Sequence, residues 1–404
     1  MEHTHDLPPG PSAPHEPAPG APVTAPAERP LTIRFTGSGS EYFRIWIVNL
    51  LLSIVTLSLY RPFAKVRRLK YFHGNTFVDD HALGFHGNPW RMLRGYLLVG
   101  AMAVCYSVAG RVSATAGLVA FVAVFALWPA LWRASMQFRL ANTSWRGLRF
   151  RFTGDLAGAY AALLPLFVPS LIALAMGFGL DDRRTPPAWY LQALLALFGL
   201  GALLLPLAWW NLKRYQHGHY ALGQLQTRLE GGSGQLYWLS VRVVLMFIGM
   251  FAATFAVAIV LGTVLGMTQR LSFAAGLDAE TKMALAGVAG VLVYLVVLVA
   301  TVPYATSRLQ NLVWNGTTAP ALRFDSHLRF RSLLGLTVKN WLLVLVTLGL
   351  YWPFAAVATW RLRVQSVTPQ LADDIDRLHA QASQRVDDAS GEMAGDFFGL
   401  DIGL

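Results

Sequence analysis

The sequence has little charge, a single cysteine and few acidic residues. Charged residues make up 14% of its 404 residues, against roughly a quarter in a typical soluble domain. Hydrophobic residues reach 54%, and the mean hydropathy is +0.44. Cys105 has no second cysteine to pair with, so an intrachain disulfide and a CxxC metal site are both excluded. The deficit of charge indicates a membrane protein.

Sequence motifs for binding phosphate or zinc, or for acyl transfer, are missing as well. No GxxxxGK[ST] or GxGxxG loop lies in a phosphate-binding context, and there is no HExxH helix or GxSxG elbow. His217 and His219 have the spacing of one strand face, but two histidines alone are a weak metal signal. We therefore expect no enzyme activity, no cofactor and no metal.

Long apolar runs dominate what is present. Several of them reach the roughly 20 residues that cross a bilayer as a helix. Their cores contain no Asp, Glu, Lys or Arg, which weakens the hypothesis of a proton-coupled carrier. The eight segments are about Phe43–Tyr60, Gly95–Gly110, Ala114–Trp132, Ala157–Leu180, Ala188–Trp210, Val243–Met267, Met283–Tyr304 and Val338–Thr359. The predicted fold class is an all-α polytopic membrane protein.

Basic residues gather in the four long connections between these segments. The long connections carry 21 Lys and Arg, against 5 in the three short ones, so the positive-inside rule puts the long loops in the cytoplasm. The net charge of +11 therefore indicates a membrane protein rather than a nucleic-acid partner. We expect contact with the lipid bilayer and with anionic headgroups. The candidate headgroup ligands lie on one basic stretch: Lys65, Arg67, Arg68 and Lys70.

Residues 49–66 and 340–357 are two copies of one stretch. NLLLSIVTLSLYRPFAKV and NWLLVLVTLGLYWPFAAV share twelve identities in eighteen ungapped positions, which predicts an internal repeat. We expect the copies to pack against each other through shared polar and turn residues. The alternative is a pair of broken helices that line a solute site. The candidate packing or pathway residues are Asn49, Thr56, Tyr60, Pro62, Asn340, Thr347, Tyr351 and Pro353.

The long connections share a second pattern. Each follows a proline at the end of an apolar segment, then passes a turn-like cluster and an alternating stretch such as LRFRFTG. The proline predicts a helix break, and the alternation predicts a short strand pair. We expect four units of two membrane helices and a small cytoplasmic β-hairpin, with a degenerate copy at the end. Neighbouring hairpins are expected to join into a small sheet, because isolated hairpins are only marginally stable.

The side on which the first and last apolar segments end is ambiguous. If both segments cross the membrane, there are eight spans and both termini lie outside the cytoplasm. If both dip in and return, the repeat pattern is preserved, and we favour this re-entrant interpretation. The domain organisation is a disordered Pro-, Ala- and His-rich tail (1–30), a membrane domain (31–368) and an acidic, Gly-rich tail (369–404).

The stretches EYFRIWIVNLL, LYRPFAKVRRLKYFHGNT and LGLYWPFAAV resemble the YjgN family of bacterial inner-membrane proteins. The resemblance covers about residues 31–368 and implies a multi-pass protein of the bacterial cytoplasmic membrane. It implies no activity, because the family is defined by a domain of unknown function. We expect a structural or accessory membrane component; the alternative is a transporter or channel for a small solute or lipid.

Overall fold

The computed structural model of the chain describes residues 29–178, 187–267 and 278–372. The segments predicted as tails, 1–30 and 369–404, lie mostly outside these ranges. Where they overlap with them, the residues form strands: β1 is Arg29–Pro30 and β12 is Val367–Leu371. The folded part therefore extends at both ends past the predicted limits of the membrane domain.

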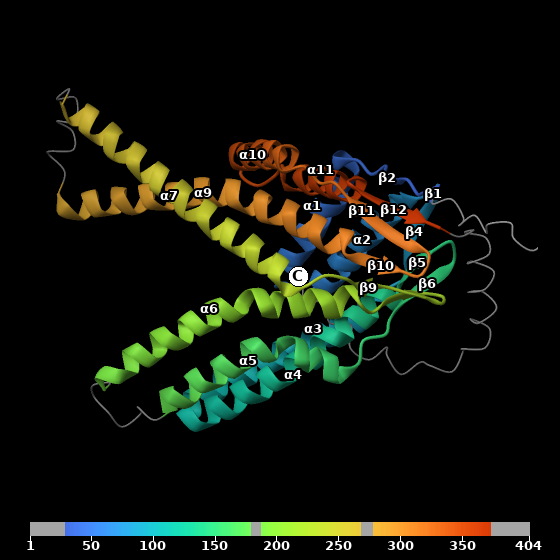
Figure 1. Ribbon diagram of the computed structural model, residues 1–404, viewed down its shortest axis with the longest axis horizontal. Coiled ribbons are helices and arrows are strands. Elements are labelled where there is room, and N and C mark those ends of the chain that lie inside the picture. The colour runs from blue at the N-terminus through green and yellow to red at the C-terminus, as the bar shows by residue number, and fades with distance from the viewer. Residues whose placement is uncertain (1–28, 179–186, 268–277, 373–404) are drawn as a thin grey trace, which may run out of the picture.

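One order of elements recurs along the chain: a strand, two helices and a strand (Figure 1). The helices are α1 (Gly39–Val55), α2 (Arg61–Gly74), α3 (Pro89–Val112), α4 (Ala114–Ala141), α5 (Leu156–Phe178), α6 (Ala188–His217), α7 (Ser233–Met267), α9 (Ala279–Asn315), α10 (Phe330–Val346) and α11 (Trp352–Gln365). The remaining strands are β2 (Ile33–Phe35), β3 (Thr76–Val78), β4 (His81–Phe85), β5 (Thr143–Trp145), β6 (Leu148–Phe152), β7 (Tyr220–Leu222), β8 (Leu225–Gln226), β9 (Arg228–Leu229), β10 (Thr317–Ala319) and β11 (Leu322–Ser326).

Polar side chains fix where several helices begin. Before α1, Ser38 Oγ accepts the Glu41 N–H at 3.2 Å and the Glu41 carboxylate accepts the Ser38 N–H at 3.4 Å. This reciprocal pair is a capping box. Ser113 ends α3 and caps α4, because its Oγ accepts the Ala116 N–H at 3.0 Å. The α3–α4 connection is therefore as short as one capping residue.

Six of the helices are long and apolar enough to cross a membrane: α3, α4, α5, α6, α7 and α9. Much of their apolar surface is exposed in the isolated chain, as expected for helices whose solvent is lipid. The chain is thus a multi-pass helical membrane protein. The other two predicted segments, at the two ends of the chain, form shorter helices.

The helical membrane class is confirmed, but the predicted description as all-α with small hairpins is incomplete, because the strands build two antiparallel sheets at one end of the molecule (Figure 1). One sheet has the order β2-β3-β4-β5-β6-β7-β8 and the other β1-β12-β11-β10-β9. The alternating stretches do form strands. Neighbouring hairpins do pair with one another, but in a sheet of seven strands and a sheet of five rather than in one small sheet.

The two sheets meet at two seams and close into a ring, called here the strand ring. At one seam β1 pairs with β12 and β2 with β3, with only two residues between β1 and β2. Leu31 N donates to Pro369 O at 2.7 Å, and Asp79 N donates to Thr32 O at 3.0 Å. At the other seam, Thr227 alone separates β8, which pairs with β7, from β9, which pairs with β10. A closed ring leaves few unpaired strand edges.

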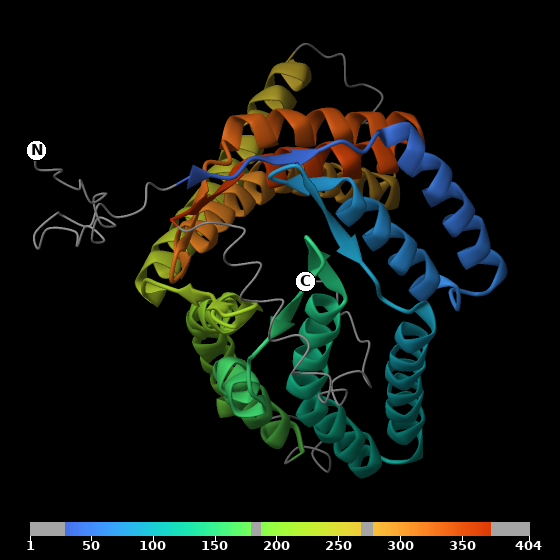
Figure 2. The same ribbon diagram turned by 90° about the vertical axis from the view of Figure 1, so that its right-hand side faces the viewer.

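The helices close into a second ring above the strands, called here the helix ring (Figure 2). Each helix contacts the next along the chain, and α11 contacts α1. Phe354 of α11 packs against Phe43 of α1, with ring centroids 5.8 Å apart. A Cβ added at Gly39 would lie 2.4 Å from the Phe354 ring, so only glycine allows this approach. The two ends of the chain therefore meet in both rings.

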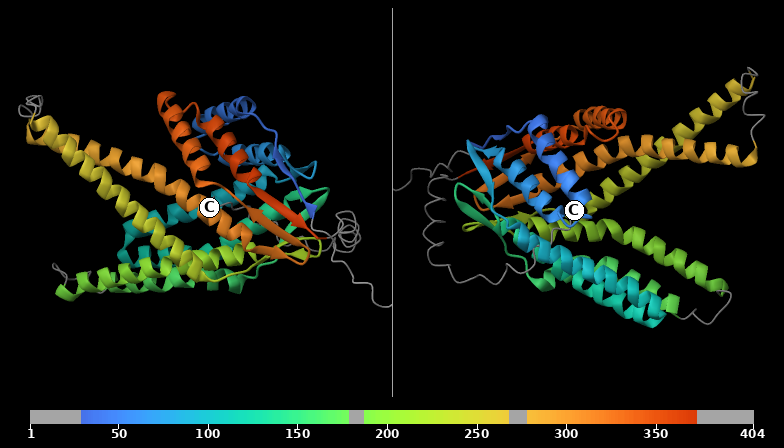
Figure 3. Two further views of the ribbon diagram at one scale, coloured as in Figure 1. Left: turned by 45° about the horizontal axis from the view of Figure 1, so that its top comes forward. Right: turned by 180° about the vertical axis from the view of Figure 1, so that it is seen from behind.

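The first and last helix pairs are short and turn back on themselves. Between α1 and α2 the backbone passes through left-handed φ angles at Leu57 (47°) and Ser58 (72°), and between α10 and α11 at Leu348 (50°) and Gly349 (94°). Because β2 leads into α1 and pairs with β3 after α2, the chain leaves and re-enters the strand ring on the same side. Figure 3 shows the two short pairs side by side. Each short pair therefore leaves the strand ring and returns to it, which is the path of the chain that the re-entrant interpretation predicts.

Proline does not break the helices of the long pairs, which corrects the prediction. Pro129, Pro206 and Pro303 lie inside α4, α6 and α9, and these helices continue to the strand ring. Pro129 and Pro303 are fully buried, so packing holds the helix together despite the missing N–H donor. Of the five prolines in this pattern, only Pro62 and Pro353 lie at the start of a helix.

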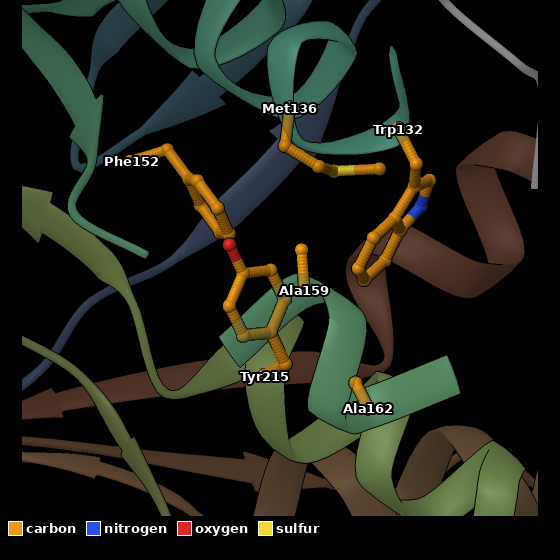
Figure 4. Packing of buried hydrophobic residues seen from close by; sticks show 6 residues of the cluster. All are labelled: Trp132, Met136, Phe152, Ala159, Ala162 and Tyr215. Carbon is orange, nitrogen blue, oxygen red and sulfur yellow. The ribbon is translucent and has the colours of Figure 1, made fainter. Parts of the chain in front are cut away.

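The junction of helices and strands holds much of the buried core. In one cluster, Trp132 and Met136 of α4 pack on Ala159 and Ala162 of α5, together with Phe152 and Tyr215 (Figure 4). The Tyr215 hydroxyl donates to Asp155 O at 2.6 Å, which satisfies its polar end. The helix ends are thereby anchored rigidly to the strand ring.

Candidate functional site

The strand ring encloses a cavity of about 330 Å³, called here the chamber. Its walls are almost entirely apolar. The volume lies at the lower end of the range of small-molecule pockets, about 300–1,000 Å³. The residues that line it and carry the argument below are Leu148, Phe150, Trp145, Leu322, Phe324 and Leu371, with Tyr220, Trp314 and Thr317 on the side of the helices.

Alternation along the strands explains why the chamber is apolar. In β6, Leu148 and Phe150 line the chamber, whereas Arg149 and Arg151 are exposed. Successive side chains of a strand point to opposite faces, so one face of β6 is apolar and the other basic. The alternation in LRFRF predicts a strand. It also determines which side chains of β6 face the chamber and which face outward.

Cross-strand pairing keeps the inner residues together. Leu322 of β11 lies opposite Leu371 of β12, and Phe324 lies opposite Pro369. On the outer face of the same strands, Arg323 lies opposite Gln370. Pairs of large apolar side chains stabilise a sheet by roughly 0.2–1 kcal/mol each. The chamber wall is thus built by the same register that holds the sheet.

Polar groups lie where the chamber meets the helix ring. Thr317, fully buried, donates its hydroxyl to Val313 O at 2.7 Å and lies 3.2 Å from His217 Nδ1. The His217 ring packs edge-on against Trp314, with centroids 5.2 Å apart. Burial raises the pKa of the Tyr220 phenol to about 12, so this lining group stays protonated at neutral pH and can donate a hydrogen bond.

Three basic side chains of α4, α6 and α11 lie near one another close to the ends of these helices. Lys213 of α6 lies within Coulombic range of Arg139 of α4 and Arg363 of α11. Arg139 also acts on Tyr220, which lines the chamber. Arg363 Nε donates to Gln310 Oε1 at 2.8 Å, which links α9 to the same group. These residues are called here the basic cluster: Arg139, Lys213 and Arg363.

Arg363 is exposed near the end of α11. Desolvation by the surrounding protein lowers the pKa of its guanidinium. The basic cluster was not found by sequence reasoning, because nothing in the local pattern places residues 139, 213 and 363 together.

The predicted residues of the two repeat copies form matched turns. Thr56 Oγ1 donates to Leu52 O at 2.7 Å and accepts the Tyr60 N–H at 3.0 Å. In the second copy, Thr347 Oγ1 donates to Leu343 O at 2.6 Å and accepts the Tyr351 N–H at 3.0 Å. Each threonine therefore satisfies backbone groups at the break.

The two buried asparagines hydrogen-bond within their own helix pairs. Asn49 Oδ1 accepts from Arg67 of α2 at 3.4 Å. Asn340 Nδ2 donates to Ala355 O and to Thr359 Oγ1 of α11, both at 3.4 Å. The contact between the first and last helix pairs runs through Phe43, which precedes the first copy, and Phe354. Neither asparagine, nor any other predicted residue of the copies, lines the chamber.

The predicted headgroup ligands lie on α2. Arg67, Arg68 and Lys70 are exposed, and Lys65 is half-buried. The Arg67 guanidinium sits 5.6 Å from the centre of the Tyr60 ring, and that of Arg68 5.7 Å from the Phe72 ring. Aromatic faces therefore hold two of these cations near the protein surface.

Comparison with known proteins identifies a family. The chain is 22% identical over 375 residues to "Inner membrane protein YjgN" of Salmonella typhimurium, covering 86% of this chain and 90% of that protein. It is 27% identical over 157 residues to the protein of the same name in Escherichia coli K12, covering 38% of each chain. No solved structure matches. Residues 30–397 match the family described as "Bacterial protein of unknown function (DUF898)", and the chain belongs to this family.

Proposed function

We propose that this protein binds a membrane-soluble small molecule in the chamber and passes it between the bilayer and the aqueous face, without catalysis. The observation that carries the proposal is the chamber itself: an apolar cavity of about 330 Å³ enclosed by a ring of strands. An apolar pocket with a few convergent polar groups is the usual form of a ligand site. A purely mechanical scaffold would be expected to fill such a space with side chains.

This proposal favours the transport alternative that the sequence raised, but it puts the ligand site at a different place in the molecule. The sequence pointed to the two broken helices as the pathway, whereas the chamber lies among the strands. We propose that the five strand–helix–helix–strand units are internal repeats, and that the strand ring lies in the cytoplasm beneath the bacterial inner membrane. Two observations support this side: the relatives are named inner membrane proteins, and the exposed Arg149, Arg151 and Arg323 suit the positive-inside rule.

A structural role is a second candidate, favoured by the closure of both rings. The contact of α11 with α1 and the pairing of β1 with β12 join the ends of the chain. The exposed cations Arg67, Arg68 and Lys70 on α2 suit anionic headgroups. In this role the protein would bind the membrane surface and would need no ligand in the chamber.

Filling the chamber distinguishes the two roles. Ala319 lines the chamber opposite Leu322, so Ala319→Trp occupies the space. Gln370→Trp adds the same side chain on the outer face of β12, two strands away in the same sheet, and serves as the matched control. Proteins in phosphatidylcholine nanodiscs are offered dodecanol, and bound dodecanol is measured by native mass spectrometry. We expect binding to wild type and to the control, and at least tenfold weaker binding to Ala319→Trp.

The melting temperature of each variant shows whether it has folded. Equal dodecanol binding by a folded Ala319→Trp would overturn the chamber as the ligand site. Absence of binding to wild type would favour the structural role.

A further inference from the structure

Four aromatic rings follow one another along the helix side of the chamber and are called here the aromatic arc: Tyr220, His217, Trp314 and Phe324. The centroid of the His217 ring lies 5.2 Å from that of Tyr220 and 5.2 Å from that of Trp314. The Trp314 ring in turn lies 5.0 Å from that of Phe324. Tyr220, Trp314 and Phe324 line the chamber, whereas His217 is buried and does not. The arc therefore presents three rings, from β7, α9 and β11, to the space inside the strand ring.

A further aromatic ring lies across the chamber from the arc. Phe150 is the third residue of β6, Phe324 is the third residue of β11, and both line the chamber. In the order of the described strands around the strand ring, β6 lies five strands from β11 in one direction and seven in the other. The two phenylalanines therefore occupy matched positions on facing walls.

The aromatic rings of both walls retain accessible surface. Phe150, Tyr220, Trp314 and Phe324 are each only half-buried, although they lie on the inside of a closed ring of strands. Rings that served packing alone would be expected to be covered, because protein interiors are filled to the density of organic crystals. A flat ring placed against these side chains would cover their surface, and aromatic pairs attract each other beyond the effect of area burial.

The chamber wall carries almost no charge. Among the lining residues that the structure describes, Arg146 is the one side chain with a charge at neutral pH. It lies in the β5–β6 turn, at the end of these strands remote from the helices. Beside the aromatic arc, no lining side chain could pair with a charged ligand group, which would lose its hydration without compensation. The ligand group that binds there is therefore uncharged.

Hydrogen bonding on the helix side of the chamber favours a ligand that accepts. Two lining threonines have already used their single hydroxyl proton. Thr143 donates to Arg139 O at 2.8 Å, and Thr317 donates to Val313 O at 2.7 Å. The Tyr220 phenol is protonated at neutral pH and can donate. A carbonyl oxygen is the uncharged ligand group that matches this donor.

We infer that the chamber takes an uncharged molecule with a flat unsaturated ring and a carbonyl oxygen, the chemistry of aryl ketones and quinones. The ring lies against Tyr220, Trp314 and Phe324, and the carbonyl oxygen accepts from the Tyr220 phenol. The cavity of about 330 Å³ has room for such a ring with a short hydrocarbon chain. This inference rests on the proposed function, because it names the class of ligand for the same chamber.

The test uses four probes, three of which differ from the first in one feature. Octanophenone has the flat ring, the carbonyl and an alkyl chain. Cyclohexyl heptyl ketone has a saturated ring instead, octylbenzene lacks the carbonyl, and para-octylbenzoate carries a negative charge. Each probe is titrated against the full chain in phosphatidylcholine nanodiscs, and bound probe is measured by native mass spectrometry. Wild type is expected to bind octanophenone about fivefold or more tightly than either cyclohexyl heptyl ketone or para-octylbenzoate.

Phe324→Leu removes one ring of the arc and keeps an apolar side chain. Leucine suits this position, because Leu83 is the third residue of β4 and also lines the chamber. The variant is expected to reduce the preference for octanophenone over the cyclohexyl ketone by about twofold or more. Phe77→Leu is the matched control, since Phe77 is a half-buried residue of β3 that does not line the chamber. It should keep the preference of wild type.

Tyr220→Phe tests the carbonyl contact separately. This change removes the phenol donor and keeps the ring. Octanophenone is expected to bind about threefold or more weakly to this variant than to wild type, because one hydrogen bond is lost. The affinity for octylbenzene, which has no carbonyl, should stay the same. The melting temperature shows whether each variant has folded, and the comparison of the two ketones on wild type needs no variant.

The other outcomes each overturn a defined part. Equal binding of the two ketones to wild type, or an unchanged preference in Phe324→Leu, overturns the flat ring. Loss of the preference in Phe77→Leu overturns its placement in the chamber, and unchanged octanophenone binding to Tyr220→Phe overturns the carbonyl contact. Binding of para-octylbenzoate as tight as that of octanophenone overturns the uncharged ligand. In all these cases binding of dodecanol leaves the proposed function standing, whereas failure of dodecanol and all four probes to bind overturns both.

Discussion

The first and last helix pairs are built from the same parts as the three middle pairs but reach less far. The second helix of each pair contains a proline twelve or thirteen residues before the first residue after the helix. These prolines and end positions are Pro62 and Asn75, Pro129 and Asn142, Pro206 and Gly218, Pro303 and Gly316, and Pro353 and Ser366. In the middle pairs the helix has already run for several turns before this proline. In the end pairs it begins there, so the outer part of the pair is absent.

A five-residue turn marks the difference between the short end pairs and the long middle pairs. In both end pairs the sequence Thr-Leu-x-Leu-Tyr reverses the chain at the level of the proline. The tips that result are strongly apolar: Leu57 is 87% exposed and Leu348 is 94% exposed. Such tips belong in the bilayer rather than in water. We therefore expect the end pairs to enter the membrane partway, beside six helices that are long and apolar enough to cross it.

The largest expected effect is on the side of the membrane from which introduced cysteines react with an impermeant reagent. In a Cys105→Ser background, single cysteines replace Arg34 before α1, His81 after α2 and Asp278 before α9. Because α1 and α2 return to the strand ring, Arg34→Cys and His81→Cys should label from the same side of membrane vesicles, and Asp278→Cys from the other. The readout is labelling by an impermeant maleimide in vesicles of both orientations. Opposite sides for the first two would mean that the first apolar segment crosses the membrane.

A smaller effect is expected at the turn that shortens the last pair. Gly349 has φ of +94°, a conformation that a β-branched side chain adopts only with strain. Gly349→Val should lower the free energy of unfolding by about 1–3 kcal/mol, measured by chemical denaturation in nanodiscs.

The first copy supplies the matched control for this turn. Ser58 occupies the position of Gly349 with φ of 72°. In Ser58→Gly the relief of left-handed strain and the greater entropy of the unfolded chain oppose each other, so a change below about 1 kcal/mol is expected. Equal losses in Gly349→Val and Ser58→Gly would show that the two turns are not equivalent.

The smallest effect concerns the coupling of the two buried asparagines. Asn49 is bonded to α2 and Asn340 to α11, with no shared partner. Asn49→Ala and Asn340→Ala should each cost about 1 kcal/mol, and the double variant should equal their sum within about 0.5 kcal/mol. Thermal and denaturant unfolding give the three values. A coupling energy well above this limit would revive direct packing of the two copies through these residues.

Short sequence patterns predicted many of the helices and strands, because these elements depend on interactions between residues close together in the sequence. Runs such as 243–267 exceed the length of a bilayer crossing, and nothing but a helix satisfies their backbone there. The period of two in Leu148–Phe152 marks a strand with one apolar face. The Thr-Leu-x-Leu-Tyr sequence followed by proline marks a turn. The predicted breaks at Pro129, Pro206 and Pro303 failed because tertiary packing maintains those helices.

The sequence by itself determined the membrane class, the recurring unit and the apolar and polar faces of its strands. Only the tertiary structure decided that the units close into two rings and that a chamber and a basic cluster result. Closure depends on contacts between residues far apart along the chain, such as Arg29 with Leu371 and Phe43 with Phe354. No local propensity encodes these contacts, because they form only when all units have the right length and register. Lys213, Arg139 and Arg363 become neighbours for the same reason.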